Sequence, residues 1–99
     1  MDSYRIALGV GLLRPGVVPD DVLPAAAAAA RATTTVESFD VAIVRGQAQI
    51  SVRFLAQGND EAGVIASRVH AAVSELAAVA GPDLARRYGP RWRPVLWTP

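Results

Sequence analysis

The 99-residue chain contains no cysteine and no lysine, and it has a single histidine. The absence of cysteine excludes disulfide bonds, thiolate metal sites and cysteine nucleophiles. One histidine leaves too few ligands at useful spacing for a zinc site. The sequence also matches neither the glycine-rich dinucleotide-binding motif nor the phosphate-binding loop. We therefore expect neither a metal nor a cofactor.

A long apolar run is missing as well. The most alanine-rich stretch, residues 25–30, is far shorter than the ~20 residues that a membrane-spanning helix requires. The N-terminal sequence MDSYRI lacks the basic segment and the following apolar segment of a secretory signal. These absences predict a cytoplasmic protein with no membrane partner.

Charge is nearly balanced, with a formal net charge of +1, but it is unevenly distributed. Residues 81–99 carry four arginines and one acid, whereas residues 1–80 carry six arginines and eight acids. Arginines mixed with aromatic residues are typical of proteins that bind single-stranded nucleic acid. The acidic remainder of the chain instead favours an edge strand solvated by arginines. The candidate basic surface consists of Arg86, Arg87, Arg91 and Arg93.

Two segments show the period-2 alternation of β-strands. Residues 3–13 alternate cleanly, which predicts a half-buried strand. Residues 34–56 predict a hairpin with a two-residue turn at positions 45–46. With this turn the apolar residues of both hairpin strands fall on one face, and Glu37 falls opposite Phe54 on that same face. A slip by one residue would scramble both faces.

Two further segments predict helices. Residues 20–32 are rich in alanine, and residues 60–80 place apolar side chains three and four positions apart. The pair Gly81-Pro82 is typical of a helix end. Residues 91–97 then predict a short final strand, and Pro94 favours an edge position because proline cannot donate to a strand ladder.

The order of elements predicts one α+β domain over residues 1–99. Strand, helix, strand, strand, helix, strand is the ferredoxin-like βαββαβ arrangement, a two-layer sandwich with an antiparallel sheet in the order 4-1-3-2 and both helices on one face. This layout resembles that of the dimeric α+β barrel proteins, some of which are monooxygenases or polyketide cyclases. The resemblance is one of topology and includes no motif.

The open face of this sheet carries small residues. Glycine inside a strand lowers stability and often marks the close approach of another backbone or a ligand. We therefore expect this face to contact a second copy of the chain, giving a homodimer, or a partner protein. The face shows no aromatic ring on which a nucleic-acid base would stack. It consists of Ala7, Gly9, Gly11, Ala42, Gln49 and Ser51.

Three functional hypotheses follow. The first is a non-enzymatic interaction or assembly module that uses the small-residue face. The second is a cofactor-independent enzyme with a cleft between sheet and helices, in which His70 is a weak candidate for a general base. The third is a nucleic-acid binder that uses the C-terminal arginines. The sequence favours the first, leaves the enzyme hypothesis open and disfavours nucleic acid.

Overall fold

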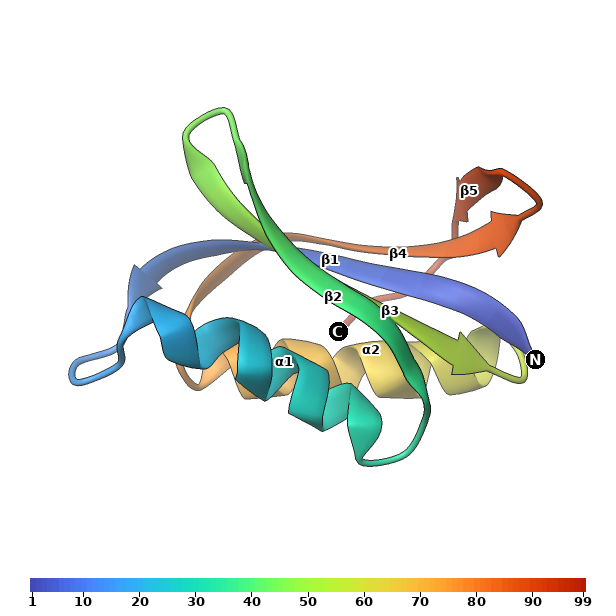
Figure 1. Ribbon diagram of the computed structural model, residues 1–99, viewed down its shortest axis with the longest axis horizontal. Coiled ribbons are helices and arrows are strands. Elements are labelled where there is room, and N and C mark those ends of the chain that lie inside the picture. Colours follow the sequence, from blue (N-terminus) through green and yellow to red (C-terminus); the bar gives the residue numbers. More distant parts are fainter.

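The computed structural model describes residues 1–99 and shows an α+β protein with a five-stranded antiparallel sheet and two α-helices. Both helices lie against the same face of the sheet, which gives two layers (Figure 1). The opposite face is open. The elements are β1 (Asp2–Leu13), a 3-10 turn (Pro19–Asp21), α1 (Val22–Arg31), β2 (Val36–Val44), β3 (Gln47–Ala56), α2 (Asn59–Ser74), β4 (Ala77–Tyr88) and β5 (Arg91–Pro94).

The strands lie in the order β2-β3-β1-β4-β5, which differs in detail from the predicted order 4-1-3-2. The first four strands keep that order when read from the other edge, but the fourth is not the predicted segment 91–97, and a fifth strand is added beside it. The segment beside β1 is β4, whose residues 77–80 were predicted as the end of a helix and whose remaining residues were not predicted as a strand. The predicted helix 60–80 ends at Ser74. The predicted edge strand 91–97 shrinks to the four residues of β5, which pairs with β4 rather than with β1.

A bulge in β4 explains why its sequence does not look like a strand. Ala7 pairs with Asp83 and Gly9 pairs with Ala80, so the two β4 residues between these pairs fall outside the ladder. Gly81 adopts a left-handed φ of +55° there, and the neighbouring proline occupies a place where no ladder donor is needed. Gly81-Pro82 therefore marks a bulge, and the prediction that it ends a helix is wrong.

The hairpin register agrees with the prediction over most of its length. Phe39 pairs with Val52, and Val41 pairs with Ile50. Arg45 and Gly46 have φ angles of 53° and 79°, as a type I′ turn requires. The prediction for Glu37 is wrong, because a register shift at the start of β2 leaves it unpaired. Its carboxylate instead accepts a hydrogen bond from the Ser3 hydroxyl.

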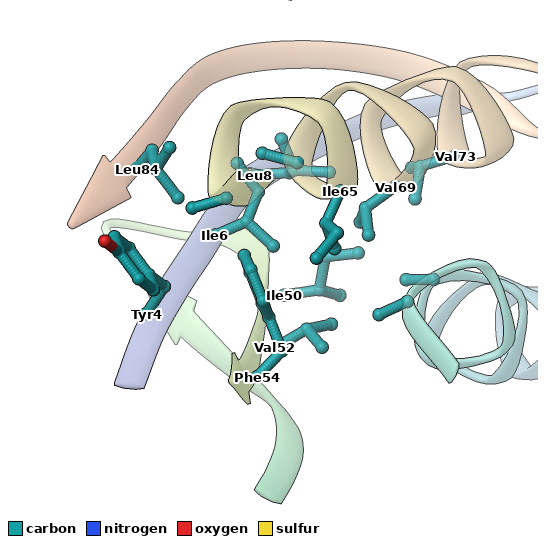
Figure 2. Close-up of a cluster of buried hydrophobic side chains, with 14 of the residues drawn as sticks. Tyr4, Ile6, Leu8, Ile50, Val52, Phe54, Ile65, Val69, Val73 and Leu84 are labelled. Carbon is teal, nitrogen blue, oxygen red and sulfur yellow. The ribbon is translucent and has the colours of Figure 1, made fainter. Parts of the chain in front are cut away.

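The helices differ in how they pack. α1 buries small side chains, among them Ala26, Ala27 and Ala30, so this helix lies close to its neighbours. α2 buries larger side chains, including Ile65 and Val69, over the middle of the sheet (Figure 2). Neither helix has the combined length and apolarity needed to cross a membrane.

The core lies between the sheet and the helices. Tyr4 and Phe54, which pair across β1 and β3, stack with ring centroids 6.0 Å apart. The labelled side chains that follow them on β1 and β3 point from the sheet toward α2 (Figure 2). The largest fully buried side chains are Tyr4, Phe54, Ile6, Leu8, Ile65, Leu84, Val52, Val69 and Val73.

Candidate functional site

The six predicted residues of the small-residue face come together on three strands. Ala7 pairs with Ser51, and Gly9 and Ala42 both pair with Gln49. At Gly9, however, the need for glycine comes from a contact within the chain. A Cβ atom at Gly9 would lie 3.0 Å from the carbonyl oxygen of Ala80. The close approach that the glycines indicate is therefore made at Gly9 by β4 of the same chain.

The outer edge of β2 is uncovered. Residues 37–44 are all exposed, and the hairpin projects away from the helical layer (Figure 1). Three of these side chains belong to the apolar face that faces inward elsewhere in the sheet. Phe39 is 39% exposed, Val41 55% and Ile43 71%. Large apolar side chains on an unpaired edge strand favour pairing with another strand.

The turn fixes which backbone groups of β2 point outward. In a type I′ turn the residues on either side, here Val44 and Gln47, hydrogen-bond to each other. Backbone direction alternates along a strand, so the N–H and C=O groups of Ile43, Val41 and Phe39 point away from β3. Phe39, Val41 and Ile43 thus combine exposed apolar side chains with unpaired backbone groups.

An apolar pocket of about 590 Å³ lies beneath the hairpin, beside the start of α1. Val41 and Ile50 form part of its sheet wall, and Val22 and Leu23 form part of its helix wall. Asp20 is the one titratable residue in its lining. Any general acid–base chemistry in this pocket would therefore have to use Asp20.

His70 lies apart from this pocket. Its Nδ1 atom is 3.5 Å from the Ser74 hydroxyl oxygen, one turn further along α2. Its ring meets Trp97 edge to face, with centroids 6.5 Å apart. A carboxylate that would orient the imidazole is missing from these contacts, so the catalytic role of His70 gains no support from the geometry.

The four C-terminal arginines do not form one patch. Arg86 donates to Asp2 at 2.8 Å and to the Asn59 side chain, whereas Arg87 donates to the backbone carbonyl of Gly89. Consecutive residues of a strand face opposite sides of the sheet, so Arg86 and Arg87 are separated by it. Arg91 and Arg93 are exposed on β5. Arg93 pairs with Arg86, and Arg91 pairs with Tyr88, so Arg86, Arg91 and Arg93 share one face of the sheet and Arg87 lies on the other.

Arg86 also belongs to a small network around a buried tyrosine. The Tyr4 hydroxyl donates to Asn59 Oδ1 at 2.8 Å, the same atom that Arg86 approaches at 3.3 Å. Burial raises the pKa of Tyr4 above its ordinary value of 10.0, and the nearby Arg86 guanidinium opposes part of this shift. The network joins the N-terminus of β1 to α2 and β4.

Trp92 contradicts the expectation that the open face has no aromatic ring. It pairs with Arg87 across β4 and β5, and its ring lies 4.7 Å from the Arg5 guanidinium carbon and 5.2 Å from that of Arg53. The sequence does not predict this cluster, because only the pairing of β5 with β4 brings Trp92 over Arg5 and Arg53, which are far away in the sequence.

No protein-family model, curated protein or solved structure matches this chain. A proposal for its function therefore rests on the surfaces described above. The β2 edge combines exposed apolar side chains with free backbone groups, whereas His70 lacks an orienting carboxylate and the C-terminal arginines are divided between the two faces of the sheet.

Proposed function

We propose that this protein is a non-enzymatic assembly module that forms a homodimer by pairing the β2 strands of two copies. The observation that carries the proposal is the nine-residue β2 edge, whose outward backbone groups and apolar side chains are left uncovered. Antiparallel pairing about a two-fold axis joins the two sheets into one ten-stranded sheet. Such an interface is self-complementary, as cyclic dimers require.

Charge eliminates two of the possible registers. A two-fold axis perpendicular to the sheet keeps the helices of both copies on the same side of the joined sheet. Residues directly opposite each other must then have side chains on the same face, so the axis passes between one residue and its own copy. Centring on Asp40 sets this carboxylate against its own copy, which is destabilising for like charges directly opposite. Centring on Ala42 sets Phe39 against the Arg45 of the second copy, which mismatches an apolar and a charged side chain.

Centring on Val41 avoids both problems. Phe39 then faces the Ile43 of the second copy, and Val41 meets its own counterpart at the axis. Position 37 falls opposite the Arg45 of the second copy, so opposite charges meet at both ends of the interface when the Glu37 carboxylate turns from Ser3 toward the edge. The outward groups of positions 39, 41 and 43 supply about six backbone hydrogen bonds.

The small-residue face is the alternative docking surface for the same function, for a second copy or for a partner protein. It is less favoured, because Ala80 already accounts for Gly9 and because Ala7 is 8% exposed. The β2 edge has few such contacts: the Arg31 guanidinium lies over the Phe39 ring and Val41 lines the apolar pocket, yet Val41 and Ile43 stay more than half exposed. Protein interaction through the edge therefore explains more of the structure than interaction through the face.

Light scattering coupled to size exclusion, over a concentration series, tests this proposal. Wild type is expected to be a dimer, and Val41→Lys is expected to be a monomer because a charge at the axis meets its own copy. Val64→Lys is the matched control, because Val64 on α2 is 54% exposed and Val41 is 55% exposed. Thermal unfolding of both variants checks that each remains folded.

Gln49→Arg distinguishes the two surfaces, because Gln49 lies on the open face of β3 and not on the edge. Under the edge proposal this variant stays dimeric. Dissociation of Gln49→Arg with a dimeric Val41→Lys would assign the interface to the sheet face. A monomeric wild type at all concentrations would refute self-association.

A further inference from the structure

Two arginines lie directly opposite each other on the open face of the sheet. Arg5 on β1 pairs with Arg53 on β3, and like charges in this position are destabilising. Both guanidinium groups lie against Trp92, which β5 places over the same end of the sheet. Contact with the ring offsets part of the repulsion, since a guanidinium is attracted to an indole face. It leaves the two positive charges without a direct ion pair.

No carboxylate lies within 4.0 Å of either guanidinium group, although Asp40 lines the same end of the sheet. The one ion pair within 4.0 Å joins Arg86 to Asp2, on the other face of the sheet. The Nε atom of Arg53 is buried and has no hydrogen-bond partner. A buried donor without an acceptor lowers stability, so its presence calls for an explanation. Asp40 is nearby, but its carboxylate accepts a hydrogen bond from the Ser51 hydroxyl at 2.8 Å.

These side chains surround a cavity of about 210 Å³. The guanidinium groups and the Ser38 hydroxyl supply hydrogen-bond donors, whereas the Ser51 hydroxyl donates to Asp40. The space is large enough for a tetrahedral oxyanion. Guanidinium groups bind phosphate through two parallel N–H···O bonds, a geometry that lysine does not provide. The lining consists of Arg5, Ser38, Asp40, Ser51, Arg53 and Trp92.

We propose that this cavity binds the phosphate group of a small molecule. The phosphate accepts hydrogen bonds from Arg5 and Arg53, including the unpaired Nε of Arg53, and removes the repulsion between the two guanidinium groups. A small ligand fits better than a polynucleotide, because Arg86 is held by Asp2 and Arg87 by Gly89. The site lies on the open face, where Ser38 and Asp40 of β2 form part of its lining, whereas the proposed pairing uses the outward backbone groups of β2.

Isothermal titration calorimetry with inorganic phosphate and with phenyl phosphate tests the site. Wild type is expected to bind one phosphate per chain. Arg5→Gln and Arg53→Gln are each expected to weaken binding about tenfold, the effect of losing a charge-assisted hydrogen bond. Arg68→Gln is the matched control, because Arg68 is an exposed arginine on α2, and it should leave the affinity unchanged.

Tryptophan fluorescence provides a second readout at the same site. In a Trp97→Phe background Trp92 is the only tryptophan, and phosphate is expected to change its emission as the guanidinium groups turn from the ring toward the anion. A single-stranded oligonucleotide without a terminal phosphate tests the other source of phosphate groups and is expected not to bind this site.

Three results would overturn the proposal: no saturable binding of either phosphate, equal loss of affinity in Arg68→Gln, or binding of the oligonucleotide alone. Loss of folding in Arg5→Gln or Arg53→Gln would also count against it, because the repulsion between the arginines predicts that each variant is at least as stable as wild type. Thermal unfolding measures that stability without phosphate.

Discussion

The two edges of the sheet differ in length, in charge and in the backbone groups that they leave free. β5 has four residues, and two arginines and a proline are among them. β2 has nine residues without arginine or proline, and its apolar residues are Val36, Phe39, Val41, Ile43 and Val44. Short length, positive charge and proline are the features by which proteins prevent edge pairing. One edge of this sheet is therefore protected, and the other is not.

This asymmetry determines the kind of assembly that we expect. Pairing of one edge about a two-fold axis uses up that edge in both copies, so the assembly closes as a dimer. A second available edge would allow each dimer to add further copies without limit. Protection of β5 is thus as important to the proposed dimer as exposure of β2.

Removing the protection of β5 is expected to have the largest effect. The triple variant Arg91→Val, Arg93→Val, Pro94→Thr removes the charges and restores a backbone donor on this edge. We expect species larger than a dimer to form as concentration rises, measured by sedimentation velocity. An unchanged dimer at all concentrations would show that the sequence of β5 has no part in limiting assembly.

Reversing charge at the ends of the β2 interface is expected to have a smaller effect. Glu37→Arg brings two positive charges together at both ends, and roughly 0.5–1 kcal/mol per pair corresponds to a dimer about tenfold weaker. Arg45→Glu should weaken it similarly, and the double variant should restore much of the affinity. Independent, additive losses in the double variant would contradict the register centred on Val41.

Alkaline pH tests the side of the sheet nearer β5, where the network around Tyr4 lies. The pKa of Tyr4 is raised in the folded protein, so folding favours the neutral side chain. The contribution of this side chain to stability is therefore fully present below pH 10.0 and is lost as the pH rises toward its pKa in the folded state. The free energy of unfolding should therefore fall more steeply above pH 10.0 in wild type than in Tyr4→Phe.

At neutral pH, Tyr4→Phe should lower the free energy of unfolding by about 1 kcal/mol, because the hydrogen bond to Asn59 is lost. Denaturant unfolding at a series of pH values measures both effects. Parallel pH profiles for the two proteins would show that ionisation of Tyr4 does not contribute to alkaline unfolding.

The smallest effect is expected at the cavity that Trp92 of β5 helps to form. Asp40→Asn removes the one negative charge from the cavity lining. Phosphate should then bind roughly two- to threefold more tightly, as expected for a partly exposed like charge. Calorimetry measures the change, and weaker binding in this variant would indicate that Asp40 contributes to the site.

The sequence predicts the β2 side of the sheet better than the β5 side, for physical reasons. The hairpin is a local structure whose alternation and turn residues agree, so its register follows from about twenty consecutive residues. β4 starts with alanine and valine, which continue the helical spacing of α2, and its bulge contains Gly81-Pro82. Only pairing with β1, far away in the sequence, makes this segment a strand.

The same distinction applies to the candidate sites. The exposed edge of β2 is not evident from the sequence, because Phe39, Val41 and Ile43 follow the pattern of buried residues. They are exposed because no strand pairs with β2 on its outer side and the hairpin projects beyond the helices. The cluster of Arg5, Arg53 and Trp92 depends on three strands meeting, so no local pattern predicts it.

Amide hydrogen exchange along β2, measured by NMR at low and high protein concentration, tests the proposed dimer most directly. The outward N–H groups of Phe39, Val41 and Ile43 have no partner in a single copy and exchange freely, whereas pairing protects them. We predict that protection at these three positions rises with concentration while protection in β5 stays constant. Fast exchange at all three positions in a dimeric sample would contradict pairing through β2.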